Sequence, residues 1–404
     1  MRLALLTDNF SKQTGYMANA LPRALARLGV EVHLITMDLP PYYRLPNFSS
    51  IYSGFTGQDV LSAGTREQYD GYTLHVLGHK RVLGHMRYVG LKDALNEIRP
   101  HVVQSLPAIG WIPVQALINR QRFGYALFTG SHTTASVFPL YSEKRPFWDP
   151  RMIKNFVTRV IPGRLVSLAT EKCYGATGDC AEVAVRFFGV QASKIDVCPL
   201  GVEIEMFHPV SSEGDEADRQ ERRRSLGVRP DSIVCIYTGR FTEDKNPYAL
   251  ARAVAEVRRR DDRFVSLFLG DGPQAELIRQ CSGALVHPFV PYKELPGWYR
   301  ASDIGVWPTQ ESTSMLDAAA SGLPIVVNSS LKATERIDGN GLTYHLNDID
   351  DLSRVLLTLA NPSIRQRLGR IGAARMSALF SWDAIARRRL ADYTAATARS
   401  HNHR

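Results

Sequence analysis

Short apolar runs alternate with amphipathic helical stretches in both halves of the chain, and this alternation constrains the fold more than any other feature. The first half contains predicted strands at 2–8, 30–36, 101–106, 125–132, 175–178 and 194–202, with helices such as 16–29 and 91–100 between them. A second series covers 232–240, 264–272, 284–290, 303–309 and 324–330, and the pattern is helical beyond about 350. Strands that alternate with helices form βαβ units around a parallel sheet. The sequence therefore predicts an α/β protein with two doubly wound, Rossmann-like domains that face each other across a cleft.

A polar and charged stretch at 209–229 separates the two series of strands. A chain of 404 residues is longer than one hydrophobic core usually serves. We therefore expect a first domain over 1–208 and a second domain over 209–380.

The composition is that of a globular protein, with 44% hydrophobic and 22% charged residues. The formal net charge of +9 favours phosphate-bearing ligands, anionic membranes or nucleic acid without choosing among them. The five cysteines are scattered and show no CxxC spacing, which favours reduced, buried thiols in a cytoplasmic chain. The apolar run in "MRLALLTDNF" ends after five residues, so it indicates a first strand rather than a signal peptide. No apolar run reaches about 18 residues, and we expect no membrane-spanning segment.

Two cations follow the strand at 232–238. The segment "TGRFTEDKN" contains Gly239, then Arg240, then Lys245 before a predicted helix. An arginine fork and a mobile lysine charge beside a helix start suit a diphosphate. A solvated turn with Asp244 or Asn246 as the helix cap explains the same spacing equally well.

The segment "TQESTSMLDAAASGLPIVV" (309–327) predicts a strand exit, a helix and a further strand. Ser312 or Ser314 can cap the helix, so that backbone N–H groups point outward to hold a phosphate. Asp317, one turn deeper, can accept hydrogen bonds from ribose hydroxyls. A plain helix cap is the simpler explanation of this segment alone, but the series Arg240, Lys245 and Asp317 at strand ends of one sheet favours a nucleotide.

Two further strand ends carry weaker signals. The turn "LGDGP" (269–273) is typical of close backbone approach. The apolar loop "HPFVPYKELPGWY" (287–299), which includes Val290, can line a flat base or form an ordinary turn before a helix.

These motifs together resemble the donor domain of a GT-B glycosyltransferase of the retaining GT4 family (glycosyl transferases group 1). The Gly-Arg…Lys-Asn segment is similar to the family's diphosphate clamp, and "LFLGDGP", "VPYKELPGWYRASDIGVWPT", "LDAAASGLPIVV" and "ATERIDGNGLTYHLNDIDDLS" follow in the family's order. "KIDVCPLGVEIEMFHP" resembles the stretch that closes the acceptor domain. "FSWDAIARRRLADY" resembles the terminal helix that crosses back onto that domain, which adds 381–404 to the first domain.

The resemblance implies roles for particular residues. Arg240 and Lys245 would hold the diphosphate and stabilise the leaving group, with Gly239 and the 312–315 amides beside them. Asp317 would bind ribose. Gly15 would lie in the glycine loop near phosphate and acceptor, and His132 would face the donor sugar. The implied reaction is transfer of a hexosyl group from a nucleotide diphosphate sugar to an acceptor hydroxyl, with retention of anomeric configuration, no metal and no other cofactor.

The chain departs from the family pattern at the loop before Asp317. The family places two glutamates with seven residues between them and a glycine turn, whereas here Thr309 stands at the first of these positions. Glu311 lies six residues before Asp317, and Ser312, Thr313 and Ser314 replace the glycine turn. We expect the ribose contact to remain, with Glu311 as the candidate for a sugar contact.

Three other functions share parts of this pattern. A Rossmann oxidoreductase requires GxGxxG after a strand, and "TDNFSKQTGY" has a single glycine. An epimerase acting on a nucleotide sugar would need no acceptor. A catalytically degenerate nucleotide-sugar-binding protein is favoured only by the altered loop.

Basic and aromatic residues interleave over 141–165, a composition that suits either an anionic bilayer surface or a solvated helix over an ordinary core. The cations are Lys144, Arg145, Arg151, Lys154, Arg159 and Arg164, and the rings are Tyr141, Phe147, Trp148 and Phe156. The expected acceptor is a glycan, a glycolipid (such as a lipid-linked or polysaccharide precursor) or a small molecule. The expected location is cytoplasmic with peripheral attachment to the inner membrane face. No nucleic-acid-binding module is present in the sequence, so we expect no nucleic-acid partner.

Overall fold

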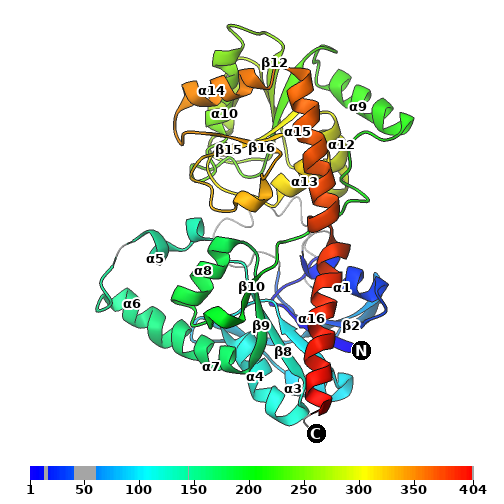
Figure 1. Cartoon of the computed structure of the whole chain (residues 1–404), viewed down its shortest axis with the longest axis vertical. Coiled ribbons are helices and arrows are strands. Elements are labelled where there is room, and N and C mark those ends of the chain that lie inside the picture. Colours follow the sequence, from blue (N-terminus) through cyan, green and yellow to red (C-terminus); the bar gives the residue numbers. More distant parts are fainter. Residues whose placement is uncertain (13–16, 41–60, 144, 403–404) are drawn as a thin grey trace. The chain divides into compact units, whose positions relative to one another are not determined.

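The chain forms two compact α/β units in a computed structural model that describes residues 1–12, 17–40, 61–143 and 145–402 (Figure 1). The first unit contains the chain up to Leu200 and the final helix from Trp382, and the second unit runs from Gly201 to Ser381. The predicted division at 208/209 lies later than the observed one. Residues 201–208 pack with the second unit because the Val202 N–H donates to the Phe380 carbonyl (2.8 Å) and the Phe207 ring contacts Tyr292 and Tyr299.

The first unit is built on an eight-stranded sheet in the order β10-β9-β8-β7-β1-β2-β4-β3, in which only β3 is antiparallel to its neighbour. A separate hairpin pairs β5 with β6. The strands are β1 (Arg2–Leu6), β2 (Glu31–Met37), β3 (Arg66–Tyr69), β4 (Tyr72–Leu77), β5 (His79–Val82), β6 (His85–Tyr88), β7 (Val102–Ser105), β8 (Ala126–Ser131), β9 (Thr170–Gly175) and β10 (Ile195–Val197).

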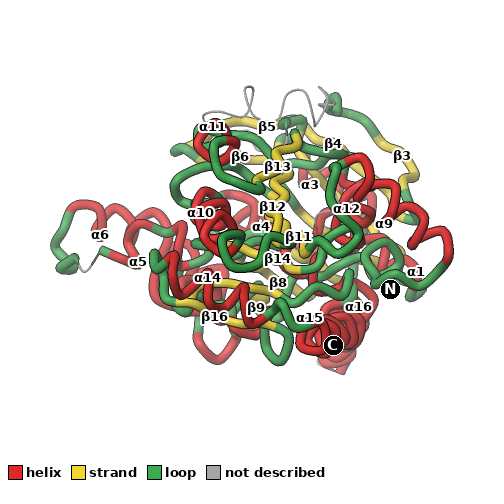
Figure 2. The backbone as a smooth tube through the Cα atoms, turned by 90° about the horizontal axis from the view of Figure 1, so that it is seen from above, coloured by secondary structure: helices red, strands yellow, loops and turns green. Residues whose placement is uncertain are grey.

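Helices cover both faces of this sheet (Figure 2). They are α1 (Met17–Arg27), α3 (Leu91–Ile98), α4 (Trp111–Phe123), η1 (Ala135–Val137), α5 (Pro139–Ser142), α6 (Pro150–Asn155), the π-helical η2 (Phe156–Val160), α7 (Ile161–Ala169), α8 (Gly178–Phe187), η3 (Ala192–Lys194) and α16 (Trp382–Asn402). Alternate strand residues point to opposite faces. Leu3 and Leu5 of β1 pack with α1 and α16, whereas Ala4 and Leu6 pack with α3, α4 and α7.

The second unit has a fully parallel six-stranded sheet in the order β13-β12-β11-β14-β15-β16. Its strands are β11 (Ile233–Thr238), β12 (Phe264–Leu269), β13 (Ala284–His287), β14 (Ile304–Trp307), β15 (Ile325–Asn328) and β16 (Gly341–Tyr344). Its helices are α9 (Glu213–Ser225), α10 (Tyr248–Val257), α11 (Ala275–Arg279), η4 (Tyr292–Glu294), α12 (Leu295–Arg300), α13 (Ser314–Ala320), η5 (Thr334–Arg336), α14 (Ile349–Thr358), α15 (Pro362–Arg375) and the π-helical η6 (Met376–Phe380). Two doubly wound parallel sheets confirm the predicted fold class.

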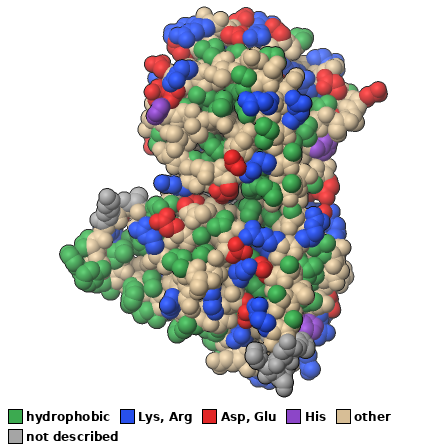
Figure 3. Space-filling model, viewed as in Figure 1, with side chains coloured by type: hydrophobic (Ala, Val, Ile, Leu, Met, Phe, Trp, Pro, Cys, Tyr) green, Lys and Arg blue, Asp and Glu red, His purple; other side chains and the backbone are tan. Residues whose placement is uncertain are grey.

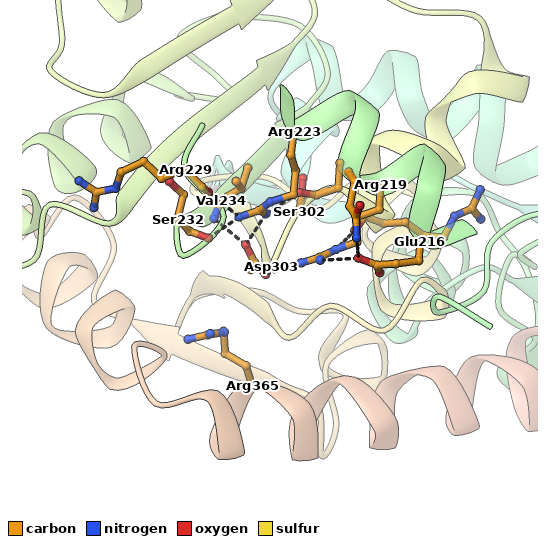
Figure 4. A network of polar contacts seen from close by, with 12 residues as sticks. Glu216, Arg219, Arg223, Arg229, Ser232, Val234, Ser302, Asp303 and Arg365 are labelled. Carbon is orange, nitrogen blue, oxygen red and sulfur yellow. Dashed lines mark hydrogen bonds and ion pairs between the residues drawn. The ribbon is translucent and has the colours of Figure 1, made fainter. Parts of the chain in front are cut away.

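The charged stretch at 209–229, which follows the predicted domain boundary, contains α9. Ser212 and Asp215 form a capping box at its first turn, which satisfies backbone N–H groups at both residues. Near its end the buried Arg223 donates to the Asp303 carboxylate (3.1 Å) and the Ser232 carbonyl (2.6 Å), as Figure 4 shows. The ion pair attaches this largely polar helix to the start of β14, and the bond to Ser232 attaches it to the start of β11.

Other differences are local. The predicted strand at 175–178 is wrong, because β9 ends at Gly175 and Gly178 begins α8. The strands β3 to β6 and β16 were not predicted. Among the residues that the structure describes, no helix is both long and apolar enough to cross a membrane.

Candidate functional site

The carboxyl ends of β11 and β14 bring the predicted diphosphate residues to one edge of the second sheet. β11 and β14 are paired in parallel, so the loops that follow them emerge side by side. Glycines in the adjacent "LGDG" turn allow close packing there. Gly270 has a φ of 153°, and a Cβ at this position would lie 1.9 Å from the Gly239 carbonyl oxygen. The predicted role of this turn in close backbone approach is therefore confirmed.

Lys245 and Arg240 both lie in the loop after β11. The Lys245 Nζ donates to the Glu311 carbonyl at 3.3 Å, which joins this loop to the one before α13. Burial lowers the pKa of Lys245, while the carboxylates of Asp244 and Glu311 oppose that shift. The Arg240 guanidinium lies 3.7 Å from the Asp244 carboxylate, and its side chain is 30% exposed. The site thus holds one half-buried and one accessible cation.

The predicted helix caps in these loops differ from the observed ones. α10 begins at Tyr248, and neither Asp244 nor Asn246 caps it; its N-cap residue is Pro247. Asn246 has a left-handed backbone with a φ of 44°.

The N-terminus of α13 also lacks the predicted side-chain cap. Its N-cap residue is Thr313, whose side chain makes no capping hydrogen bond. Instead the Ser314 N–H donates to the Ser312 Oγ (3.3 Å), and the two serine hydroxyls lie 3.0 Å apart. The three hydroxyl residues are all partly exposed. They surround a short helix start with polar groups, although Ser312 lies one residue before the N-cap and so bonds the first helical N–H rather than the second or third.

Asp317 lies in the first turn of α13. Its side chain keeps part of its surface exposed. The carboxyl nevertheless lies deep enough that burial raises the pKa of Asp317 to about 8, with the charge of Glu203 as the second cause. The neighbouring Tyr299 hydroxyl lies 2.8 Å from the Thr238 Oγ1. A carboxyl in this recess can exchange a proton near neutral pH and can accept hydrogen bonds from a polyol.

Arg336 is a further residue of this site that the sequence analysis missed. It is 4% exposed, and its Nη1 donates to the Ser312 carbonyl at 3.2 Å. Asn328 Nδ2 donates to the carbonyls of Pro308 (3.0 Å) and Thr309 (2.7 Å). Buried side chains of Asn328 and Arg336 therefore bind backbone carbonyls at both ends of the segment 308–312. Nothing in the local sequence at 336 signals this role, because the contact joins residues that are brought together only by the fold.

Val290 has a buried side chain, 5% exposed, in the loop after β13.

The remaining predicted residues belong to the first unit. His132 directly follows β8 and is exposed. The buried Arg389 of α16, 1% exposed, lies near it and stacks over the Tyr174 ring at 4.5 Å. Gly15 lies outside the described residues.

The acidic run at 348–351 has a structural role. Asp348 caps α14 by accepting the Asp351 N–H at 2.8 Å, and the Asp351 carboxylate is bound by the His345 N–H and by Arg354. Within the described ranges, no group of three or more histidine, cysteine, aspartate or glutamate side chains is arranged to hold a metal ion.

Comparisons with known proteins agree with this architecture. A family model described as glycosyl transferases group 1 matches residues 232–361. A D-inositol 3-phosphate glycosyltransferase of Xylanimonas cellulosilytica is 30% identical over 405 residues, which cover 94% of this chain and 90% of the relative. An enzyme of the same name from Kribbella flavida is 29% identical over 401 residues, covering 93% and 89%.

Solved structures show the same fold. Sucrose-phosphate synthase from Thermosynechococcus elongatus has a TM-score of 0.70 at 17% identity and covers 98% of this chain and 99% of that one. Anabaena HepE in complex with UDP-glucose has a TM-score of 0.66 at 13% identity, covering 98% and 100%. The fold is therefore that of a GT-B glycosyltransferase. The chain belongs to the glycosyl transferases group 1 family, GT4, and the predicted family and class of activity are confirmed.

Proposed function

We propose that this glycosyltransferase takes a sugar from a nucleotide diphosphate sugar and transfers it to an acceptor hydroxyl with retention of anomeric configuration and without a metal ion. The observation that carries the proposal is the position of Arg240 and Lys245 after β11, with Lys245 reaching the loop of Glu311. Two cations at this strand end suit two phosphate groups.

Electrostatic stabilisation of the leaving group is the expected source of catalysis. When the nucleotide diphosphate departs, negative charge grows on its terminal phosphate while the anomeric carbon becomes cation-like. Arg240 and Lys245 would stabilise that negative charge, and in this proposal they take the place of a metal ion. Asp317 would hold the ribose, and Glu311 and His132 are the candidates for contact with the sugar.

The names of known proteins suggest which ligands to test first. HepE has been solved with UDP and with UDP-glucose, so a uridine diphosphate sugar is our first donor candidate. The relatives of similar length are named for D-inositol 3-phosphate, which makes a phosphorylated cyclitol the first acceptor candidate beside a glycan or glycolipid. A cytoplasmic location with peripheral attachment to the inner membrane face is part of the same proposal.

A donor panel followed by a transfer assay tests this function. The correct nucleotide diphosphate sugar should raise the melting temperature of the protein by mass action. Transfer by purified protein should fall by roughly 10²-fold in Arg240→Ala, by analogy with the loss of an oxyanion-hole donor. The matched control is Arg252→Ala, which removes an exposed cation from α10.

Three results would contradict parts of the proposal. Donor binding without any transfer or hydrolysis would support the degenerate binding protein. Loss of activity on addition of a chelator would remove the metal-free mechanism. An inverted anomeric centre in the product, measured by NMR, would remove retention.

A further inference from the structure

An exposed apolar helix face lies in the first unit, on helices that carry none of the donor-site residues assigned above. The continuous helical segment 150–169, formed by α6, η2 and α7, spans about 30 Å at 1.5 Å per residue. Six large apolar side chains recur along it at intervals of one to four residues and are each between 44% and 59% exposed: Ile153, Phe156, Val157, Ile161, Leu165 and Leu168. We call these six residues the α6–α7 face. Figure 3 shows hydrophobic side chains gathered over this region at the lower left.

The opposite side of the same segment is firmly anchored to the unit. A Cβ on Gly163 would lie 1.8 Å from the Phe188 carbonyl oxygen, so the helix contacts the turn after α8 at the closest approach that glycine allows. Asn155 Nδ2 donates to the Phe187 carbonyl (3.0 Å), and the Gln191 N–H donates to the Ser167 Oγ (2.9 Å). The helix therefore cannot turn its apolar residues inward without breaking these contacts.

A loop before α6 presents two more exposed aromatic rings. Phe147 is 78% exposed and Trp148 is 66% exposed, and the two rings pack edge to face at 4.9 Å. Arg145 fixes this tip by ion pairs with Glu143 and, at 2.7 Å, with Asp149. Asp149 also caps α6 by accepting the Arg151 N–H. An ordered tip that exposes a tryptophan is typical of a membrane-interface anchor.

The positive charge of residues 150–170 indicates which partner fits the α6–α7 face. Residues 150–170 contain four cations and no carboxylate. Arg151, Lys154 and Arg164 are exposed beside the α6–α7 face. A second copy of this chain would bring the same positive charge against itself, whereas anionic lipid headgroups complement it.

We propose that the α6–α7 face, with Phe147 and Trp148, docks the protein onto an anionic lipid bilayer, with the helix lying flat in the headgroup region. This docking rests on the peripheral attachment that is part of the proposed function and assigns it to particular residues. It does not depend on the transfer reaction, because none of these residues belongs to the donor site. The apolar side chains enter the headgroup boundary while the cations contact lipid phosphates.

Vesicle flotation of the full chain tests the proposal. The wild-type protein should float with phosphatidylcholine vesicles that contain phosphatidylglycerol and not with phosphatidylcholine alone, and high salt should weaken binding. Phe156→Ser with Leu165→Ser should reduce partitioning at least tenfold. Lys154→Gln with Arg164→Gln should reduce it roughly fivefold for each cation. The matched control, Leu277→Ser with Arg279→Gln, removes an exposed apolar residue and an exposed cation from α11 and should leave flotation unchanged.

Two readouts separate the outcomes. Tryptophan fluorescence should shift to the blue on anionic vesicles, and Trp148→Phe should abolish most of the shift. Unchanged melting temperature and donor binding in the variants would show that loss of flotation does not come from misfolding or from a damaged donor site. Absence of flotation by wild type, equal flotation on neutral vesicles, or self-association in sedimentation that the same variants abolish would each overturn the proposal.

Discussion

Replacing Arg223 by methionine should destabilise the second unit by about 3 kcal/mol. Arg223 is 6% exposed and donates to the Asp303 carboxylate (3.1 Å) and to the carbonyls of Ala301 (2.9 Å) and Ser232 (2.6 Å). Removal of one partner of a buried ion pair costs about 3–5 kcal/mol. The lower end applies here because the Val234 N–H, at 2.8 Å, still binds the Asp303 carboxylate.

Calorimetry of the full chain measures this loss. A unit of this size changes its melting temperature by about 2–4 °C per kcal/mol, so the transition of the second unit should fall by about 6–12 °C. The chain contains two units, and the transition must therefore be assigned to one of them before a free energy is derived. A donor nucleotide, which should bind the second unit, marks its transition by raising it.

The adjacent residue supplies the control. Arg224 pairs with Glu221 on the same helix, but the two side chains are 74% and 66% exposed. Arg224→Met should change stability by about 0.5 kcal/mol or less. If Arg223→Met and Arg224→Met melt together, the buried ion pair does not hold α9 in place. Adding Asp303→Asn to Arg223→Met should cost less than the sum of the two single changes, because the carboxylate that would be left with only the longer Arg219 ion pair (3.5 Å) is then neutral.

Three further predictions concern the donor site and the first unit. Burial raises the pKa of Asp317 to about 8, and ribose hydroxyls donate best to an ionised carboxylate, so affinity for a nucleotide diphosphate sugar should rise with pH through about 8 and then level off. Titration calorimetry should show this rise for the wild type and a flat profile for Asp317→Asn. A flat wild-type profile would contradict the ribose role. Arg336→Met should weaken donor binding about tenfold or more, because the Ser312 carbonyl loses its buried hydrogen-bond donor. Arg336→Lys should restore part of the donor affinity. A fall in melting temperature with unchanged affinity would show that Arg336 only supports the fold. Burial, and then the neighbouring His33, lower the pKa of His75 from 6.5 to about 4. Protons therefore favour the unfolded chain, and the free energy of unfolding should fall by up to about 3 kcal/mol as pH drops from 6.5 toward 4. In melting scans His75→Gln should lose less stability over this range, and equal losses in the variant and the wild type would exclude His75 as the cause.

The parts of the site that could be predicted from sequence are those in which strand, turn and ligand-binding residue are adjacent in the chain. Arg240 and Lys245 follow one strand directly, so the periodicity that predicts β11 also places them at its end. Pairing of β11 with β14 then brings the loop of Glu311 close, as expected for neighbouring strands of a parallel sheet.

The parts that could not be predicted depend on contacts between distant segments. Arg336 lies between β15 and β16 and contacts Ser312, 24 residues earlier in the chain, and its local sequence resembles any polar turn. α9 was not predicted, because its mean composition is strongly polar and the contacts that bury Arg223 include residues far along the chain. The short helix at 314–320 lacks its expected cap because its N-cap residue is Thr313, and Ser312, one residue earlier, bonds only the first helical N–H.

The bond between the Lys245 ammonium and the Glu311 carbonyl has a consequence for ligand choice. In the free protein the half-buried Lys245 ammonium already donates to a peptide carbonyl. A ligand must therefore offer a hydrogen-bond acceptor that stabilises this charge more strongly than the carbonyl does. A neutral nucleoside offers no such group and would compete poorly, whereas a phosphate oxygen carries full charge. We therefore expect this contact to disfavour uncharged analogues of the donor.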